Sequence, residues 1–297
     1  MKKIIGLSFF VLALGLFSCN NENTDIANIS DDLSEKSAAI AVAEVQVEAT
    51  TTEAEAEVEF FANAELLLSE WWRIGKKFGW HPSHKMRYMA QCPDVVIEEG
   101  ENDGYPKIIT LNYGDSTVLR NGHVLSGEMI IEISAPRRSQ DYMRTITYNA
   151  FGKDSVVVTG TSIVEVDKVD EMFRKFTSNL TITISDTTVI TRESERIWQW
   201  IAGLDTDDHS DDVITISGSA TAEMDGLSYK KAITTPLKRV GDCRYIVEGI
   251  IEITLNGDVI CTMDYGDGTC DEIAEMTNAD GTTEIDLSEH KVKCKCK

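Results

Sequence analysis

The fold is decided by the stretch Ile250-Ile251-Glu252-Ile253-Thr254-Leu255-Asn256-Gly257-Asp258-Val259-Ile260-Cys261-Thr262-Met263. In its first half, apolar residues alternate with Glu252 and Thr254, which is the period of a strand with one buried and one solvent-facing side. Asn256-Gly257 then interrupts the pattern. This pair is favoured in two-residue hairpin turns because both positions require positive φ. The stretch therefore predicts an antiparallel β-hairpin.

The same period of two recurs through residues 92–290, which we predict to be one antiparallel β-domain. Leu180, Ile182 and Ile184 alternate with hydroxyl residues, and Val213-Ile214-Thr215-Ile216 is a further strand core. Threonine and serine at alternate positions indicate strands with one apolar and one wetter face. We predict a mainly β protein, with an antiparallel sheet or sandwich of about a dozen strands and one amino-terminal amphipathic helix.

The hairpin has an echo earlier in the chain. Ile108-Ile109-Thr110-Leu111-Asn112-Tyr113-Gly114-Asp115-Ser116-Thr117 matches Ile260-Cys261-Thr262-Met263-Asp264-Tyr265-Gly266-Asp267-Gly268-Thr269 at six of ten positions. A shorter echo pairs Gly127-Glu128-Met129-Ile130-Ile131-Glu132-Ile133 with Glu248-Gly249-Ile250-Ile251-Glu252-Ile253. The echoes occur in opposite order, which excludes a simple tandem array. We infer two related hairpin corners that close the two ends of one sheet system.

At these residues the sequence resembles a family of uncharacterised lipoproteins from Bacteroidetes-type bacteria, over residues 92–287. The resemblance implies an exported, lipid-anchored, β-rich domain, and it assigns no catalytic or binding residues. At the first corner the family often has a cysteine where this chain has Thr117 and Val118. The matching pieces are Cys92-Pro93, Tyr105-Pro106-Lys107, Thr110-Leu111-Asn112-Tyr113-Gly114, Gly127 and, most specifically, Asp264-Tyr265-Gly266-Asp267-Gly268-Thr269-Cys270-Asp271.

The amino terminus has the pattern of a bacterial lipoprotein signal. Lys2 and Lys3 precede an apolar stretch over residues 4–17, which is too short to span a bilayer. The stretch ends in Ser18-Cys19, which resembles the lipobox, where the cysteine is diacylated. We predict a signal peptide over 1–18, lipidation of Cys19 and attachment to the outer membrane through the acyl chains, facing the periplasm or the cell surface.

Two segments are expected between the anchor and the β-domain. Residues 20–59 contain no glycine or proline and are rich in glutamate, so we predict a self-repelling, disordered tether over 19–59. The alternative is a marginal helix, since alanine and glutamate favour helices. Over 60–72, apolar residues recur at three- and four-residue spacing, which predicts the amphipathic helix. The basic and aromatic 60–91 segment either packs on the β-domain or contacts the membrane.

Composition restricts the classes of function. The chain has 50 acidic and 28 basic residues, with a net charge of −22 at pH 7, and such a charge repels nucleic acid. Nucleophile-elbow, Walker, Rossmann and zinc-protease motifs are absent from the sequence. We therefore expect no nucleic-acid partner and assign no catalytic residues.

Six cysteines remain when Cys19 is set aside, and an even number in an exported protein predicts disulfides. Two of them, in a basic tail over 291–297, are too close in sequence to pair with each other. Six cysteines allow 15 pairings, which the sequence leaves open. The disulfide candidates are Cys92, Cys243, Cys261, Cys270, Cys294 and Cys296.

An acidic run lies between two predicted strands. Its density of carboxylates suits calcium, which prefers oxygen ligands, but it lacks the glycine and distal glutamate of an EF-hand loop. A solvated loop is the main expectation for so acidic a chain, and we expect no cofactor, with calcium at this run as the alternative. The candidate ligands are Asp205, Asp207, Asp208, Asp211 and Asp212.

Three functions are compatible with these features. The first is a non-enzymatic envelope module, held at the membrane by its lipid anchor, that binds an envelope protein or lipid. The second is a carrier of an apolar ligand in a curved sheet beneath a helix. Trp198 and Trp200, two apart on one strand, would share one face and either line such a trough or pack in the core. The third, an extracytoplasmic hydrolase, has no supporting motif.

Overall fold

The computed structural model describes residues 22–63, 93–102, 104–119, 122–137, 139–167, 170, 172–206, 209–241, 243 and 245–287. Four predicted features lie outside these residues: the signal peptide, lipidation at Cys19, residues 64–91 of the helical and basic segment, and the 291–297 tail. The same holds for Cys92, Cys294, Cys296, Asp207 and Asp208.

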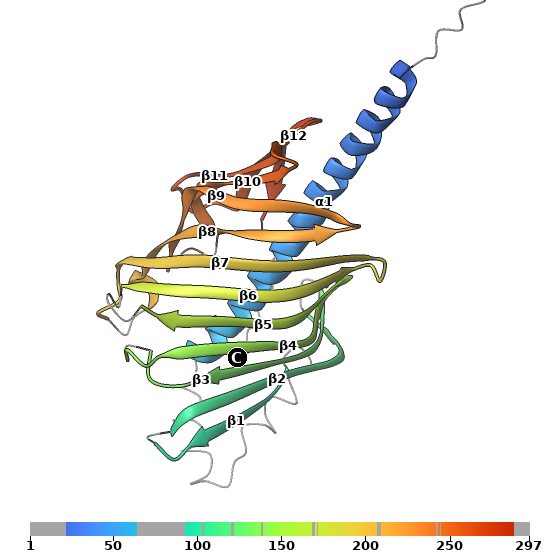
Figure 1. Cartoon of the computed structure of the whole chain (residues 1–297). Helices are drawn as coiled ribbons and strands as arrows, with labels where there is room; N and C mark the ends of the chain where they lie inside the picture. The colour runs from blue at the N-terminus through green and yellow to red at the C-terminus, as the bar shows by residue number, and fades with distance from the viewer. Residues whose placement is uncertain are drawn as a thin grey trace, which may run out of the picture. The chain divides into compact units, whose positions relative to one another are not determined.

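Thirteen strands form one sheet in which every strand pairs with its neighbours along the chain (Figure 1). The pairs are antiparallel throughout, which confirms the predicted mainly β, antiparallel fold. In the described part of the chain, one helix, α1 (Glu22–Asn63), precedes the sheet, and a short 3-10 turn, η1 (His209–Asp211), lies between two strands. The strands are β1 (Asp94–Gly100), β2 (Gly104–Val118), β3 (Val124–Ile133), β4 (Met143–Lys153), β5 (Val156–Val166), β6 (Phe173–Ile184), β7 (Thr188–Ala202), β8 (Val213–Met224), β9 (Leu227–Val240), β10 (Ile246–Leu255), β11 (Asp258–Asp267), β12 (Ile273–Asn278) and β13 (Gly281–Asp286).

The hairpin that decides the fold joins β10 to β11. Leu255 pairs with Asp258, and the two turn residues Asn256 and Gly257 have φ angles of 54° and 94°. Positive φ at both central positions is the geometry that matches the right-handed twist of the flanking strands. The two-residue turn is therefore as predicted, while the register of the two strands shifts between Ile253 and Thr254.

The two sequence echoes lie towards opposite ends of the sheet, but they do not close it, because β1 lies outside β2 and both β12 and β13 lie outside β11. One corner is the β2–β3 pair and the other is the β10–β11 pair. The backbone N–H of Gly114 donates to the Asn112 side chain at 2.8 Å, and that of Gly266 donates to Asp264 at 2.9 Å. The corners thus share a local hydrogen bond as well as a sequence, in agreement with the inference of two related corners.

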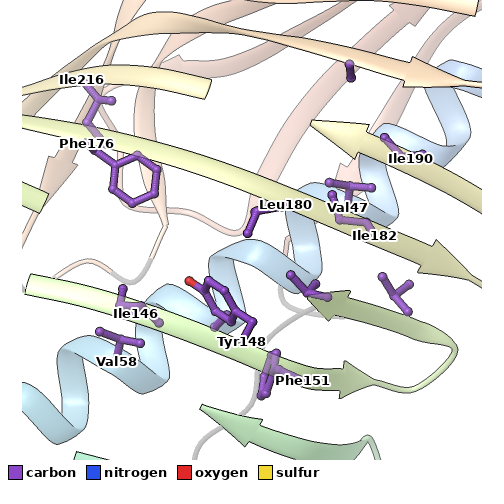
Figure 2. Packing of buried hydrophobic residues seen from close by; sticks show 14 of the residues in the cluster. Val47, Val58, Ile146, Tyr148, Phe151, Phe176, Leu180, Ile182, Ile190 and Ile216 are labelled. Atoms are coloured by element: carbon purple, nitrogen blue, oxygen red, sulfur yellow. The ribbon is translucent and has the colours of Figure 1, made fainter. Parts of the chain in front are cut away.

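The part of helix α1 from residue 43 onward is enclosed by the protein. From Ser37 onward the helix belongs to the same compact unit as the sheet, and no described side chain between 43 and 62 is exposed. Val47 and Val58 join Ile146 and Ile182 of the sheet in one buried cluster (Figure 2). The prediction of a disordered tether over 19–59 is wrong for this part, and the alternative of a helix is correct. Among the described residues, no helix is long and apolar enough to cross a membrane.

Two glycines inside strands let neighbouring backbones approach closely. Gly160 of β5 and Gly218 of β8 have φ angles of 129° and 133°. A Cβ atom on Gly160 would lie 2.2 Å from the carbonyl oxygen of Asn179, and one on Gly218 would lie 2.2 Å from that of Glu195. Both positions therefore require glycine for their φ and for their space.

Candidate ligand-binding site

Glutamates of α1 face cations on the inner surface of the sheet. The Glu44 carboxylate lies 3.7 Å from Arg192 of β7 and 3.4 Å from Lys231 of β9. The Glu59 carboxylate lies 2.8 Å from Arg144 of β4. Further pairs join Glu48 to Lys231, Glu53 to Lys153 at 3.8 Å, and Glu55 to Arg196 at 3.7 Å.

The protonation of these carboxylates depends on their partners. Burial raises the pKa of Glu44, but Arg192, Lys231 and a hydrogen bond outweigh burial and hold that pKa below its ordinary value. Glu57 instead accepts a hydrogen bond from the neutral Tyr113 hydroxyl, and burial raises its pKa. The interface therefore contains carboxylates whose pKa is held low, such as Glu44, and two, Glu55 and Glu57, whose pKa burial raises in favour of the protonated form.

Charged contacts of this kind specify geometry more than they add stability. A buried ion pair contributes little relative to well-packed apolar residues, whereas a buried charge that loses its partner is strongly destabilising. A rotation or shift of α1 would separate Glu44 and Glu59 from cations on different strands. We therefore assign this interface a structural role, which is to hold α1 in one register on the sheet.

A pocket of about 390 Å³ lies beside the ends of β6 and β7. Ligand pockets measure about 300–1,000 Å³, so the volume fits a small molecule or part of a larger one. Val166, Met172, Ile201 and Leu204 supply apolar side chains to its wall. The polar members of the wall include Arg137, Arg174 and Asp205.

Arg174 is the unusual member of this wall. Its residue is only 4% exposed, and its guanidinium carbon lies 4.3 Å from the centre of the Trp200 ring and 5.0 Å from that of Tyr142. One terminal nitrogen donates to the backbone oxygen of Arg137 at 3.1 Å. The Nε atom has no hydrogen-bond partner among the described residues. Burial lowers the pKa of Arg174 to about 10, so the side chain is still a cation at neutral pH.

The second arginine of the pocket is already neutralised. The Arg137 guanidinium donates to the Asp212 carboxylate at 2.6 Å, and Asp212 is buried. Gly203 allows this contact because a Cβ atom there would lie 2.6 Å from the Cα of Asp212. In contrast, no ion pair joins Arg174 to any carboxylate in the described part of the chain.

The described residues of the acidic run, over 205–212, contact the pocket and its neighbouring loop and do not gather around a metal site. Asp212 binds Arg137, the Asp211 carboxylate accepts a hydrogen bond of 2.9 Å from Thr206, and Asp205 lines the pocket. No group of three or more metal-ligating side chains occurs among the residues that the structure describes. The described part of the predicted calcium site thus brings no ligand set together.

One disulfide and one free thiol occur among the described cysteines, and one of the two tryptophans lines the pocket while the other packs in the core. Cys243 and Cys270 form a disulfide, whereas Cys261 is a buried free thiol, so its place among the disulfide candidates is wrong. Trp198 and Trp200 share one face as predicted, and both are buried. Trp198 stacks on Phe176, with ring centres 5.8 Å apart, and is a core residue, while Trp200 lines the pocket.

Sequence reasoning missed Arg174, although a signal was available. Arg174 occupies the same phase of β6 as the buried Phe176, Leu180 and Ile182. A charged residue at an inward position of a strand is expensive to bury unless it has a partner, and it therefore indicates a specific site. Arg137 and Met172 lie in connections between strands and give no comparable signal.

The fold and this pocket define a single-sheet antiparallel β-protein with an enclosed amino-terminal helix and one arginine-containing candidate ligand site. No protein-family model, curated protein or solved structure matches the chain.

Proposed function

We propose that the protein is an outer-membrane lipoprotein, anchored through Cys19, that acts as a non-enzymatic binding module of the envelope. The pocket lined by Arg174 and Trp200 is its ligand site. One observation carries the binding role: a buried guanidinium without a carboxylate partner lines a pocket of ligand size. Buried charges are normally paired, so a bound partner would complete this site.

A photo-crosslinking experiment in cells tests the binding role. Ile201, at the pocket wall, is replaced by the crosslinking amino acid p-benzoylphenylalanine in the full chain. Val189 on the same strand is the matched control, because the two side chains are 47% and 49% exposed and only Ile201 lines the pocket. We expect a defined adduct from position 201 that position 189 does not give. The same products from both positions, or none from 201, would contradict the proposal.

The proposed attachment to the membrane rests on the amino-terminal sequence and has its own test. Replacing Cys19 with alanine should abolish labelling by a palmitate analogue and move the protein from the membrane pellet to the soluble fraction. A variant that stays in the pellet, or a wild-type chain that takes up no label, would remove the support for the lipid anchor.

The alternative of a carrier beneath the helix has less support. Helix α1 occupies the inner face of the sheet through Val47, Val58 and its ion pairs. A pocket between α1 and β10–β13, lined by Tyr265 among others, measures about 50 Å³, far below the size of a lipid site. No observation on the described residues favours the hydrolase.

A further inference from the structure

The Arg174 pocket combines one available positive charge with an apolar wall. We infer that its ligand is an amphipathic monoanion, with one acidic group such as a carboxylate, sulfonate or phosphate monoester anion attached to an apolar body. This inference rests on the proposed binding function and names the ligand class for that site.

The anionic group follows from the surroundings of Arg174. The rings of Trp200 and Tyr142 face the guanidinium but leave the Nε–H without an acceptor among the described residues. An oxyanion accepts hydrogen bonds from adjacent guanidinium N–H groups and would supply the charge partner that is otherwise lacking. The same cation excludes ammonium ligands by repulsion.

The single charge follows from the second arginine. Arg137 is engaged by the Asp212 carboxylate at 2.6 Å, so the pair contributes no net charge to the site. Asp205 in the wall adds a negative charge that opposes a second anionic group. Among the described residues of the wall, Arg174 is the one cation without a carboxylate ion-pair partner, and it therefore sets the charge of the ligand at minus one.

The apolar body follows from the remainder of the wall. Met172 and Ile201 are large apolar side chains that remain 40% and 49% exposed, and both line the pocket with Val166 and Leu204. Exposed apolar side chains grouped at a pocket mark a binding surface, and methionine adapts its shape to varied ligands. An anion without an apolar body would leave these apolar side chains exposed to water.

Isothermal titration of the lipidated full chain in phosphatidylcholine nanodiscs tests the inference, with empty nanodiscs as the blank. The probes are octanoate, octan-1-ol and octylammonium, which share a chain and differ in charge. We expect octanoate to bind at least about tenfold more tightly than either other probe, in line with one charge-assisted contact. Equal affinities for the three probes would overturn the monoanion class.

Two variant pairs connect the affinity to this pocket. Arg174→Met should weaken octanoate binding about tenfold or more and leave octan-1-ol binding unchanged. Lys175→Met, at the next residue, whose side chain is 41% exposed and pairs with Glu195, should change neither affinity. Ile201→Glu places a carboxylate at the pocket on an exposed position and should also reduce octanoate binding, while Val189→Glu should not. Unchanged octanoate affinity in both pocket variants would overturn the assignment.

The outcomes separate this inference from the proposed function. If none of the three probes gives heat but position 201 still yields its specific adduct in cells, the ligand class is wrong and the binding function stands. If both the heat and the adduct are absent, the binding function itself fails.

Discussion

The hydroxyl of Tyr229 in β9 donates a hydrogen bond of 2.7 Å to the carboxylate of Glu44 in α1, across 185 residues of sequence. The same carboxylate faces Arg192 and Lys231. Burial raises the pKa of Tyr229, and Glu44 raises it further, so the phenol is held in its donating form. This one carboxylate therefore connects α1 to two strands, β7 and β9.

Replacing Glu44 with alanine should strongly destabilise the fold. The change leaves two buried cations, Arg192 and Lys231, without this partner, and breaking a buried pair from one side costs about 3–5 kcal/mol. The measurement is the free energy of unfolding in urea. Glu193→Ala is the control, because Glu193 is exposed on the same strand as Arg192, and it should change stability by less than about 0.5 kcal/mol. Similar losses in both variants would contradict the role of the interface.

Glu59 should make the protein less stable in acid. Burial raises its pKa, but Arg144, Arg239 and the hydrogen bond from Arg144 outweigh burial and lower the pKa from 4.5 to about 2. A depressed folded pKa gives stability that is present above the unfolded pKa and is lost as the pH falls through the folded one. Glu59→Gln should therefore reduce stability at pH 7 and flatten its decline between pH 4.5 and 2, as measured by urea unfolding across that range.

Glu57 should show the opposite dependence. Burial raises its folded pKa, so its contribution is full at low pH and is lost as the pH rises through the raised value. Glu57→Gln is uncharged and retains an oxygen that accepts from Tyr113. Relative to wild type, this variant should gain stability as the pH rises from 4 to 7 in the same urea series. A loss that matches Glu59→Gln would refute the assignment.

The glycine at position 160 should resist substitution. Gly160→Ala meets both an unfavourable φ of 129° and a backbone oxygen 2.2 Å from the new Cβ. Gly226→Ala is the control, since its φ of 76° is also positive but no atom lies within 4 Å of the new Cβ. We expect a loss of about 1–2 kcal/mol at position 226 and a clearly larger one at 160, read from thermal unfolding by circular dichroism. Equal losses of stability in the two variants would show that the close approach of the Asn179 backbone does not restrict position 160.

The disulfide should be mapped by alkylation before and after reduction. Cys243 and Cys270 should appear as one linked peptide, and Cys261 should react with an alkylating reagent only after unfolding, because it is buried. The two cysteines are 27 residues apart in the sequence. Replacing both with alanine should lower the free energy of unfolding by about 3–4 kcal/mol. A peptide that links Cys261 to either of the other two would contradict this pairing.

Much of the sheet is predictable from local sequence. Strands such as β10 show the period of two throughout, and the Asn256-Gly257 pair predicts the turn between β10 and β11, although the register of the two strands shifts between Ile253 and Thr254 and again between Glu248 and Ile250. Antiparallel hairpins between chain neighbours depend on information within about 20 residues. Sequence therefore predicts the fold class and the approximate number of strands.

Helix α1 and the pocket depend on distant residues and are harder to predict. The inward side of α1 includes Glu44, Glu53 and Glu57, so the helix shows no clean apolar stripe, and its glutamates suggest a solvated segment. Those carboxylates are tolerable because arginines, lysines and tyrosines of distant strands face them; Tyr229, for example, lies 185 residues from Glu44. Arg174 meets its pocket partners through packing between strands and loops, which sequence spacing does not encode.

The strictly sequential order of the strands has a consequence for how the protein is assembled during synthesis. The ribosome delivers α1 first, and its partners then appear in a fixed succession: Tyr113 in β2, Arg144 in β4, Arg192 in β7 and Lys231 in β9. The carboxyl-terminal part of α1, near Glu57, is matched early and the part near Glu44 late. A nascent chain that ends after β8 would carry Glu44 without Lys231 or Tyr229, so the buried contacts of Glu44 are complete only when nine of the thirteen described strands exist.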